Sequence, residues 1–208
     1  SRGLGDVYKR QPKDRRSAFL FGDGGVAALV ERDEKFGKSY FSLNSDGSRA
    51  DLIMIKGGGY RHPSSEETLR EKVVDEYGNI RSDEQGYMQG GDVFNFVIRE
   101  IPRDIKKTLE YAGDTADSFD YIVFHQANNF INAYIAKKMK LDTDKIPSTI
   151  AKYGNTSSVS VPLTIVSELK DRLYGNKKLL LSAFGVGMTW ATGIVPFVDC
   201  KISDIVEV

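Results

Sequence analysis

The chain has 208 residues, of which 40% are hydrophobic and 28% are charged, and its 29 basic residues balance 29 acidic ones. This composition predicts a folded protein with one sizeable core or two small ones, and it excludes the basic footprint of a nucleic-acid-binding protein. No apolar stretch reaches the roughly 18 residues of a membrane span, and a single cysteine excludes a disulfide framework and favours a reducing cytoplasm.

The first eleven residues, SRGLGDVYKRQ, begin without Met and lack the charged-then-apolar pattern of a secretory signal. We expect residues 1–11 to be a non-native leader, with a frayed natural segment as the alternative. On the first expectation, the rest of the chain is a piece of a longer protein.

Two apolar runs within residues 19–30 flank the turn sequence GDGG at 22–25. Asp-Gly between apolar runs is typical of a β-hairpin, so we expect strand, turn and strand here. A dinucleotide-binding loop is disfavoured, because such a loop opens a helix whereas strand-like residues follow this one. The next expected elements are a strand at 38–44, a strand at 52–55, a loop at 57–64 and a surface helix at 65–75.

Apolar residues recur every three or four positions between 92 and 112, which predicts an amphipathic helix. Pro102 lies inside this pattern, so we expect a kink or a helix in two pieces. Gly113 is a suitable C-terminal cap.

The remaining chain alternates apolar strand patterns with helical ones, which predicts an α/β layer with helices on the faces of a sheet. The expected elements are a strand at 120–124, a helix at 128–140, a strand at 148–150, a helix at 157–173 and strands at 178–184 and 189–198.

His125 follows the apolar run of its strand directly, in the sequence FDYIVFHQANNF. Open α/β sheets place ligand sites beyond the carboxyl ends of their strands, and histidine can donate or accept a hydrogen bond near neutral pH. His125 is therefore a catalytic candidate, with a satisfied structural histidine as the alternative. The asparagines at 128 and 129 begin the next helix, where amides also serve as ordinary caps.

The segment KYGNTSSVSVP at 152–162 places Asn155 directly after Gly154. One hypothesis is that the glycine lets Asn155 point its amide into a cleft. The alternative is a plain turn followed by hydroxyl caps at 156–158, since Ser and Thr are favoured at helix N-termini.

The segment SAFGVGMTW at 182–190 has two glycines around Val186. Glycines let the backbone bend sharply, and an exposed N–H at such a bend can stabilise a developing oxyanion. A plain hairpin remains the alternative.

The other reactive side chains point to no second site. His62 lies in a loop rich in Gly and Pro, and Cys200 lies in a polar tail with no base nearby to activate it. Two histidines this far apart offer no spacing typical of metal ligands, so we expect no metal site.

Four motifs occur in the order FGDGG, HQAN, GNTSSVSVPL and FGVGMTW. Together they resemble the thiolase-fold condensing enzymes, and in particular the β-ketoacyl-[acyl carrier protein] synthase III family, from about Phe19 to Phe197. The resemblance implies an α/β, thiolase-like fold. Residues 12–35 would end its N-terminal half with that half's last hairpin, and residues 36–208 would form the C-terminal half, with a mixed five-stranded sheet and helices.

The catalytic triad of that family is Cys, His and Asn, and the motifs match His125 and Asn155 to the last two. The resemblance places the nucleophilic cysteine upstream of Phe19, outside this chain, at a position that Cys200 cannot replace. It implies that the backbone N–H of Val186 stabilises an oxyanion. The residues implied to contact CoA or its pantetheine arm are Asn128, Phe184 and Gly185.

The activity implied by the resemblance is a decarboxylative condensation of an acyl group from acyl-CoA with malonyl-[acyl carrier protein]. Acyl-CoA and acyl carrier protein are then partners, no cofactor is needed, no nucleic acid or membrane is bound, and the full-length form is a homodimer. Lys137 and Lys138 match the helix face that docks the carrier protein, although a merely solvated face fits them equally. Phe130 stands where arginine is common, which bears on the choice of primer.

Two other functions stay open. One is a non-catalytic ketosynthase-like partner subunit, and the other is an acyltransferase of the same fold that makes an ester or an amide. On the principal reading the chain alone should be inactive, because it lacks the nucleophile, and it should expose part of a core that a missing half normally covers.

Overall fold

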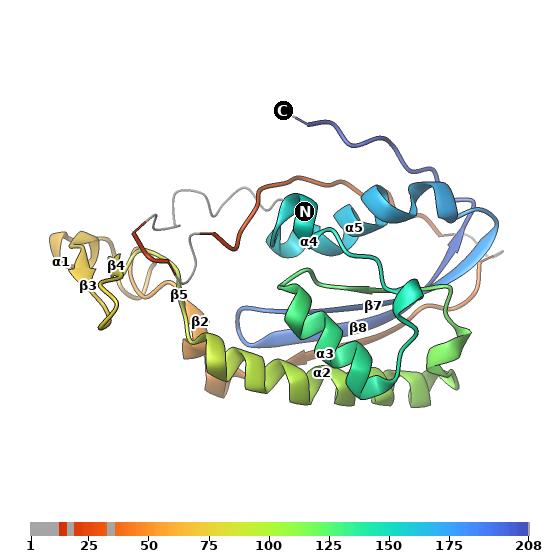
Figure 1. The fold of residues 1–208 in the computed structure, drawn as a ribbon, viewed down its shortest axis with the longest axis horizontal. Coiled ribbons are helices and arrows are strands. Elements are labelled where there is room, and N and C mark those ends of the chain that lie inside the picture. The colour runs from red at the N-terminus through yellow and green to blue at the C-terminus, as the bar shows by residue number, and fades with distance from the viewer. Residues whose placement is uncertain (1–12, 16–18, 33–35, 208) are drawn as a thin grey trace.

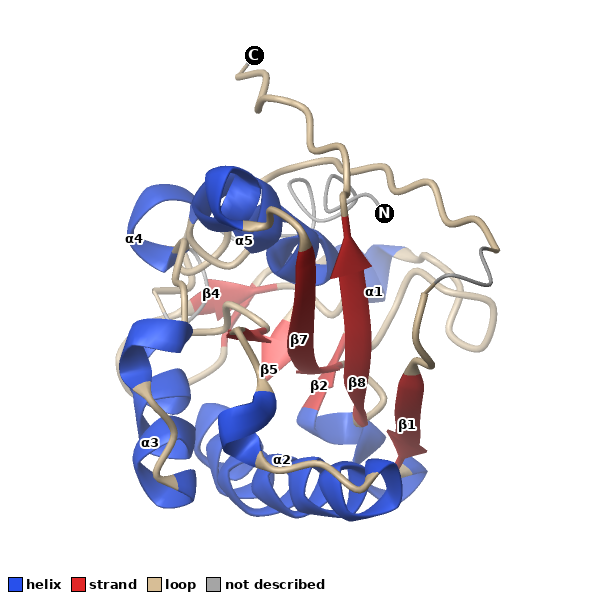
Figure 2. Ribbon diagram, turned by 90° about the vertical axis from the view of Figure 1, so that its right-hand side faces the viewer, coloured by secondary structure: helices blue, strands red, loops and turns tan. Residues whose placement is uncertain are grey.

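The structure is a computed structural model that describes residues 13–15, 19–32 and 36–207. The expected leader at residues 1–11 lies outside these ranges. The described chain is an α/β layer in which one mixed sheet carries helices on both faces, as Figures 1 and 2 show. The predicted fold class is therefore confirmed.

The main sheet has the strand order β1-β8-β7-β6. Strand β6 runs parallel to β7, and the other neighbours are antiparallel. The strands β7 and β8 form the central hairpin, in which Leu180 lies opposite Ile194. The bounds of the strands are β1 Tyr40–Ser45, β6 Tyr121–Phe124, β7 Asn176–Gly185 and β8 Thr189–Val198.

Four strands form this sheet within the described residues, where five were expected. Residues 148–150 were expected to be a strand, but they lead into the short helix α4 (Ile150–Tyr153). The backbone N–H of Thr149 donates to Oε1 of Gln126 at 3.0 Å. The Gln126 side chain thus accepts the hydrogen bond that the Thr149 N–H would donate to a neighbouring strand, and no strand forms.

A small region of turns and two-residue strands lies at one end of the molecule, on the left in Figure 1. The expected strand at 52–55 is reduced to two residues, and the expected helix at 65–75 ends at Leu69, because Arg70 already has extended backbone angles. The elements of this region are β2 Ile53–Met54, α1 Glu66–Leu69, β3 Lys72–Val73, β4 Ile80–Arg81 and β5 Tyr87–Met88, with β2 paired to β5 and β3 to β4.

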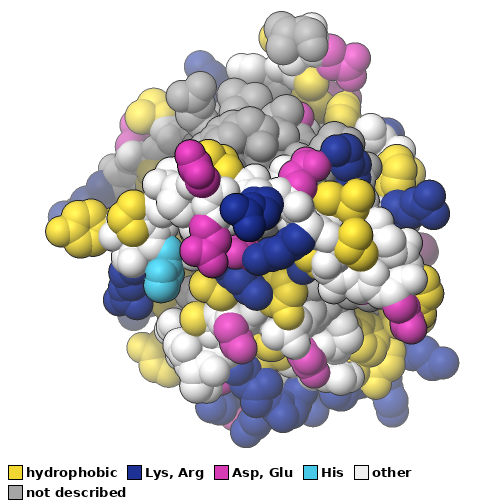
Figure 3. All heavy atoms as spheres, turned by 90° about the vertical axis from the view of Figure 1, so that its left-hand side faces the viewer, with side chains coloured by type: hydrophobic (Ala, Val, Ile, Leu, Met, Phe, Trp, Pro, Cys, Tyr) yellow, Lys and Arg dark blue, Asp and Glu magenta, His cyan; other side chains and the backbone are white. Residues whose placement is uncertain are grey.

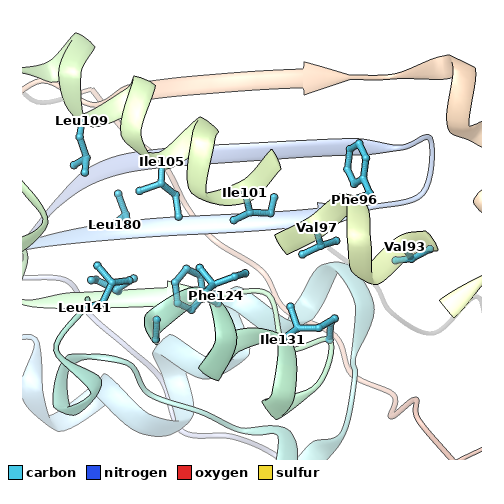
Figure 4. Close-up of a cluster of buried hydrophobic side chains, with 14 of the residues drawn as sticks. Val93, Phe96, Val97, Ile101, Ile105, Leu109, Phe124, Ile131, Leu141 and Leu180 are labelled. Atoms are coloured by element: carbon cyan, nitrogen blue, oxygen red, sulfur yellow. The ribbon is translucent and has the colours of Figure 1, made fainter. Parts of the chain in front are cut away.

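The amphipathic helix predicted at 92–112 is confirmed as α2 (Gly90–Ala112). Its apolar stripe packs on the sheet, and Val97, Ile101 and Ile105 are at most 1% exposed (Figure 4). Burying each such side chain stabilises the fold by roughly 1.5–3 kcal/mol. Pro102 lies inside the helix, which remains one element rather than two. Gly113 caps it in the left-handed conformation, as predicted.

Helices α3 (Asn129–Met139) and α2 lie on one face of the sheet, while α4 and α5 (Ser160–Leu169) lie on the other (Figures 1 and 2). Helix α5 buries Ile165 and Leu169 against Val123 and Leu179. Short 3₁₀ turns complete the described chain at Gly47–Leu52, Ala116–Ser118, Thr143–Lys145, Ser157–Val159 and Lys170–Arg172. In the part of the chain that the structure describes, no helix is both long and apolar enough to cross a membrane.

The hairpin predicted at 19–30 does not form. Its first run pairs elsewhere: Phe21 bridges to Asn155, and the N–H of Gly22 donates to the Asn155 carbonyl at 3.0 Å. The second run is left outside any strand, with Leu29 and Val30 about nine-tenths exposed. The sequence signal was misleading because a segment distant in sequence competes for the same backbone groups.

Candidate active site

His125 lies directly beyond the carboxyl end of β6, as predicted. Its backbone N–H donates to the Ser182 carbonyl at 2.8 Å, and its own carbonyl accepts from Nδ2 of Asn132 at 3.2 Å. Its ring meets Phe184 edge to face, with centroids 5.2 Å apart, and its Nδ1 lies 2.6 Å from Oγ of Ser160. Contacts to the His125 backbone, to its ring and to its Nδ1 atom therefore fix the position of this side chain.

Burial lowers the pKa of His125 to about 4. The cause of this shift is desolvation of the ring. Taking an imidazolium out of water disfavours the charged form, and His125 is neutral at physiological pH. A neutral imidazole has one N–H donor and one acceptor nitrogen.

Gln126 anchors the loop that follows β6. The side chain is fully buried, and its Nε2 donates to the Phe124 carbonyl at 2.8 Å. Its Oε1 accepts from the Thr149 N–H at 3.0 Å and from Ser148 Oγ at 3.1 Å. Gln126 thereby ties the His125 loop to the segment that leads into α4 and Asn155.

Asn155 follows α4 and is only 7% exposed. Gly154 before it has a positive φ of 66°, a conformation that favours glycine. The Asn155 backbone pairs with the segment at 20–22, and its Oδ1 accepts from the Ser157 N–H at 2.9 Å. Its Nδ2 makes no hydrogen bond within the described residues, so it is a free donor held in a fixed orientation.

The start of α5 links the two candidates. Ser160, the first residue of α5, contacts the His125 ring, and Ser157 in the preceding turn holds the Asn155 amide. The His125 and Asn155 side chains do not hydrogen-bond to each other in the described part of the chain. The structure thus brings the HQAN and GNTS motifs to one end of one helix.

The bend between β7 and β8 supplies the third predicted feature. Phe184 and Gly185 end β7, and Phe184 packs on the His125 ring. Val186 lies in the bend with 62% of its surface exposed, and its carbonyl accepts from Thr189 Oγ1 at 2.9 Å. Its backbone N–H makes no hydrogen bond within the described residues.

Comparison with known proteins shows which proteins this chain resembles. Residues 109–197 match the protein family described as 3-oxoacyl-[acyl-carrier-protein (ACP)] synthase III C terminal. A β-ketoacyl-[acyl-carrier-protein] synthase III of Streptococcus pneumoniae (strain Hungary19A-6) is 35% identical over 186 residues, which are 88% of this chain and 53% of the relative. The chain is homologous to the C-terminal part of β-ketoacyl-[acyl-carrier-protein] synthase III.

Solved structures agree. The chain is 34% identical to a 3-oxoacyl-(acyl-carrier protein) synthase from Burkholderia xenovorans LB400, with a TM-score of 0.79 over 97% of this chain and 56% of that one. It is 31% identical to a synthase III from Thermus thermophilus, with a TM-score of 0.71 over 88% of this chain and 53% of that one. The α/β architecture is thus that of thiolase-like synthase III structures, and the chain spans about half the length of its relatives.

The residues that the synthase III resemblance assigned to substrate and carrier contacts have structural partners here. Asn128 caps α3, its Oδ1 accepting from the Ile131 N–H at 2.8 Å. Lys138 donates from Nζ to the Ile98 carbonyl of α2 at 2.7 Å, whereas the exposed side chain of Lys137 makes no hydrogen bond to the described residues. Phe130, for which the resemblance led us to expect a position where arginine is common, is 68% exposed and stacks on Phe94.

Ser160 is the site residue that the sequence reading missed. The hydroxyls at 156–158 drew attention as helix caps, and nothing in the sequence marked the serine two positions later. Asn132 was missed for the same reason, since only the tertiary fold brings its amide to the His125 carbonyl.

The remaining features lie apart from this site. A cavity of about 300 Å³ in the end region is lined by residues such as Lys56, Arg81 and Tyr87, and by none of the site candidates. Figure 3 views the molecule from that end, where basic and acidic side chains lie side by side. Cys200 is exposed after β8, and no cluster of metal-ligating side chains occurs in the described ranges.

Proposed function

We propose that this chain supplies the His–Asn side of a β-ketoacyl-[acyl carrier protein] synthase III-type active site. The observation that carries the proposal is the pair of fixed donors at the start of α5. His125 is a neutral imidazole held through Nδ1 by Ser160, and Asn155 is held through Oδ1 by Ser157. His125 keeps Nε2, and Asn155 keeps Nδ2, for a substrate.

On this proposal the nucleophile is a cysteine in a part of the protein that precedes Phe19, because Cys200 lies in the tail after β8. Its thiolate attacks acyl-CoA, a thioester to the enzyme forms, and CoA leaves as a thiolate that takes up the proton the cysteine had lost. The 208 residues alone then catalyse no condensation. Residues 12–35 end the first half of the enzyme, and residues 36–208 form the second.

Malonyl-[acyl carrier protein] binds next and loses carbon dioxide. The electron pair of the broken C–C bond moves onto the thioester oxygen, giving an enolate, and His125 and Asn155 donate hydrogen bonds to that oxygen. The enolate carbon attacks the acyl-cysteine, and the Val186 N–H with that of the cysteine stabilises the tetrahedral oxyanion. Collapse of this intermediate expels the cysteine thiolate and releases the β-ketoacyl product.

A neutral His125 suits this role. Its low pKa keeps the imidazole uncharged near pH 7, so it acts as a hydrogen-bond donor and gives up no proton to the enolate carbon. A fixed neutral donor in a buried site stabilises developing charge without reorganisation at the moment of reaction.

The remaining assignments complete the proposal. Asn128, Phe184 and Gly185 contact the pantetheine arm of CoA or of the carrier protein, and Lys137 contributes to carrier docking. Lys138 already donates to the Ile98 carbonyl, which favours Lys137 over it for that contact. The enzyme uses no cofactor, forms a homodimer and works in the cytoplasm.

The test uses the protein extended by its upstream part. His125→Ala should abolish malonyl decarboxylation while the cysteine still accepts an acyl group from acyl-CoA, measured by mass spectrometry of the intact protein. His62→Ala, at the exposed second histidine, is the matched control. Normal decarboxylation in the His125 variant would contradict the role given to this residue.

A non-catalytic partner subunit is the second candidate function. A scaffold needs no free donors at His125 and Asn155, so their fixed orientation favours catalysis. The upstream coding sequence discriminates the two functions, since a partner subunit needs no cysteine at the nucleophile position. An ester- or amide-forming acyltransferase is distinguished by product analysis with alcohol or amine acceptors.

A further inference from the structure

Ser160 meets the His125 ring inside the protein. It is 1% exposed, and its Oγ lies 2.6 Å from Nδ1 of His125. The same Oγ accepts a hydrogen bond from the Gln126 N–H at 3.3 Å. Its side chain makes no further hydrogen bond within the described residues.

The direction of the short hydrogen bond follows from counting donors. A serine hydroxyl has one proton and two acceptor sites, and Gln126 already occupies one of the acceptor sites. If Nδ1 of His125 carried the proton and donated it, Oγ would accept twice and the Ser160 proton would be stranded. A stranded buried donor is costly, whereas donation from Ser160 to a bare Nδ1 satisfies every group.

We propose that Ser160 is a positioning residue that holds His125 in the tautomer with its proton on Nε2. The hydroxyl of Ser160 donates to Nδ1, and Nε2–H is left as the donor that the site presents. Its use in stabilising an enolate rests on the proposed function, whereas the tautomer itself is a property of the folded chain.

The surroundings hold this geometry. The ring cannot flip freely, because Phe184 packs on it edge to face and the His125 backbone is tied on both sides by Ser182 and Asn132. An inverted ring would present a carbon to the Ser160 hydroxyl and lose the 2.6 Å contact. Ser160 Oγ is the side-chain atom within hydrogen-bond distance of Nδ1 in the described part of the chain, so this hydroxyl influences which ring nitrogen is protonated.

The test is nitrogen NMR of the 208-residue chain labelled at its two histidines, His62 and His125. At pH 7 His125 should show a bare Nδ1 and a protonated Nε2, and a His62→Gln variant assigns the signals of the two rings. A protonated Nδ1 in His125 would overturn the proposal without any assay of activity.

Two variants sharpen the test through the sign of a pKa change. Ser160→Ala removes a donor that stabilises neutral His125, so the pKa of His125 should rise by about one pH unit and the tautomers should mix. Ser160→Thr keeps the hydroxyl and should restore both readouts. If Ser160 instead accepted from Nδ1, the alanine variant would lower the pKa, and that result would exclude the proposed direction.

Failure of this inference is distinguishable from failure of the proposed function. The tautomer is read without substrate, whereas the proposed function is tested by decarboxylation. If Ser160→Ala does not fold, the wild-type tautomer and the Ser160→Thr spectrum still decide the matter. An unchanged His125 tautomer in a folded Ser160→Ala protein would show that another group fixes the tautomer, and it would overturn the proposal.

Discussion

The ammonium group of Lys138 on α3 donates to the carbonyl of Ile98 on α2 at 2.7 Å. That carbonyl lies four residues before Pro102, which has no N–H to donate to it. Lys138 therefore occupies the one backbone acceptor that the proline leaves open. This contact joins α2 to α3 and gives the Ile98 carbonyl a partner that Pro102 cannot supply.

The first prediction concerns this contact. Lys138→Ala should lower the free energy of unfolding by about 1 kcal/mol, and Lys137→Ala should leave it unchanged. In a Pro102→Ala background residue 102 can donate to Ile98, so Lys138→Ala should then cost much less. Chemical denaturation of the four proteins of this double-mutant cycle measures the coupling. Additive effects would show that Lys138 does not compensate for the proline.

The second prediction concerns pH. An unfolded histidine titrates near pH 6.5, whereas burial lowers the pKa of His125 to about 4. Between these values the unfolded chain binds a proton that the folded chain does not, so stability should fall as the pH drops from 6.5 to 4. The loss contributed by this residue is at most roughly 3 kcal/mol. His125→Gln should flatten the pH dependence of the unfolding free energy in this window.

The third prediction concerns the segment that pairs with Asn155. A Cβ added at Gly22 would lie 1.8 Å from the Tyr153 carbonyl oxygen, whereas one added at Gly25 would meet nothing within 4 Å. Gly22→Ala should therefore detach this segment. Hydrogen exchange of the backbone N–H of Asn155, which donates to the Leu20 carbonyl, should then become faster. Gly25→Ala is the matched control. Equal exchange rates in the two variants would contradict this packing.

The fourth prediction concerns the outer face of β1. This strand is an edge strand of the main sheet. Its residues Phe41 and Leu43 are 62% and 80% exposed. An exposed apolar edge strand favours association between chains. We expect the 208-residue chain to self-associate and Leu43→Lys to reduce this, measured by analytical ultracentrifugation. Replacing Tyr60, an exposed side chain in a loop, should have no effect, and a wild-type chain that stays monomeric would count against the expectation.

The sequence alone determined those helices and strands whose own apolar pattern and caps specify their type. Helix α2 followed from its apolar period and its glycine cap, and β6, β7 and β8 followed from long apolar runs. These patterns hold because each element buries one face or one stripe wherever it packs. The motifs around His125 and Asn155 were likewise visible in the sequence.

Tertiary structure decided what depends on competition between distant groups. The segment at 19–22 pairs with Asn155 rather than with its neighbour in sequence, and the expected strand at 148–150 gives up a backbone donor to Gln126. The partner of His125 is a serine 35 residues away, among several hydroxyls that look alike in the sequence. Each donor or acceptor bonds to the partner that the fold brings within about 3 Å. The local sequence does not specify which distant group comes that close.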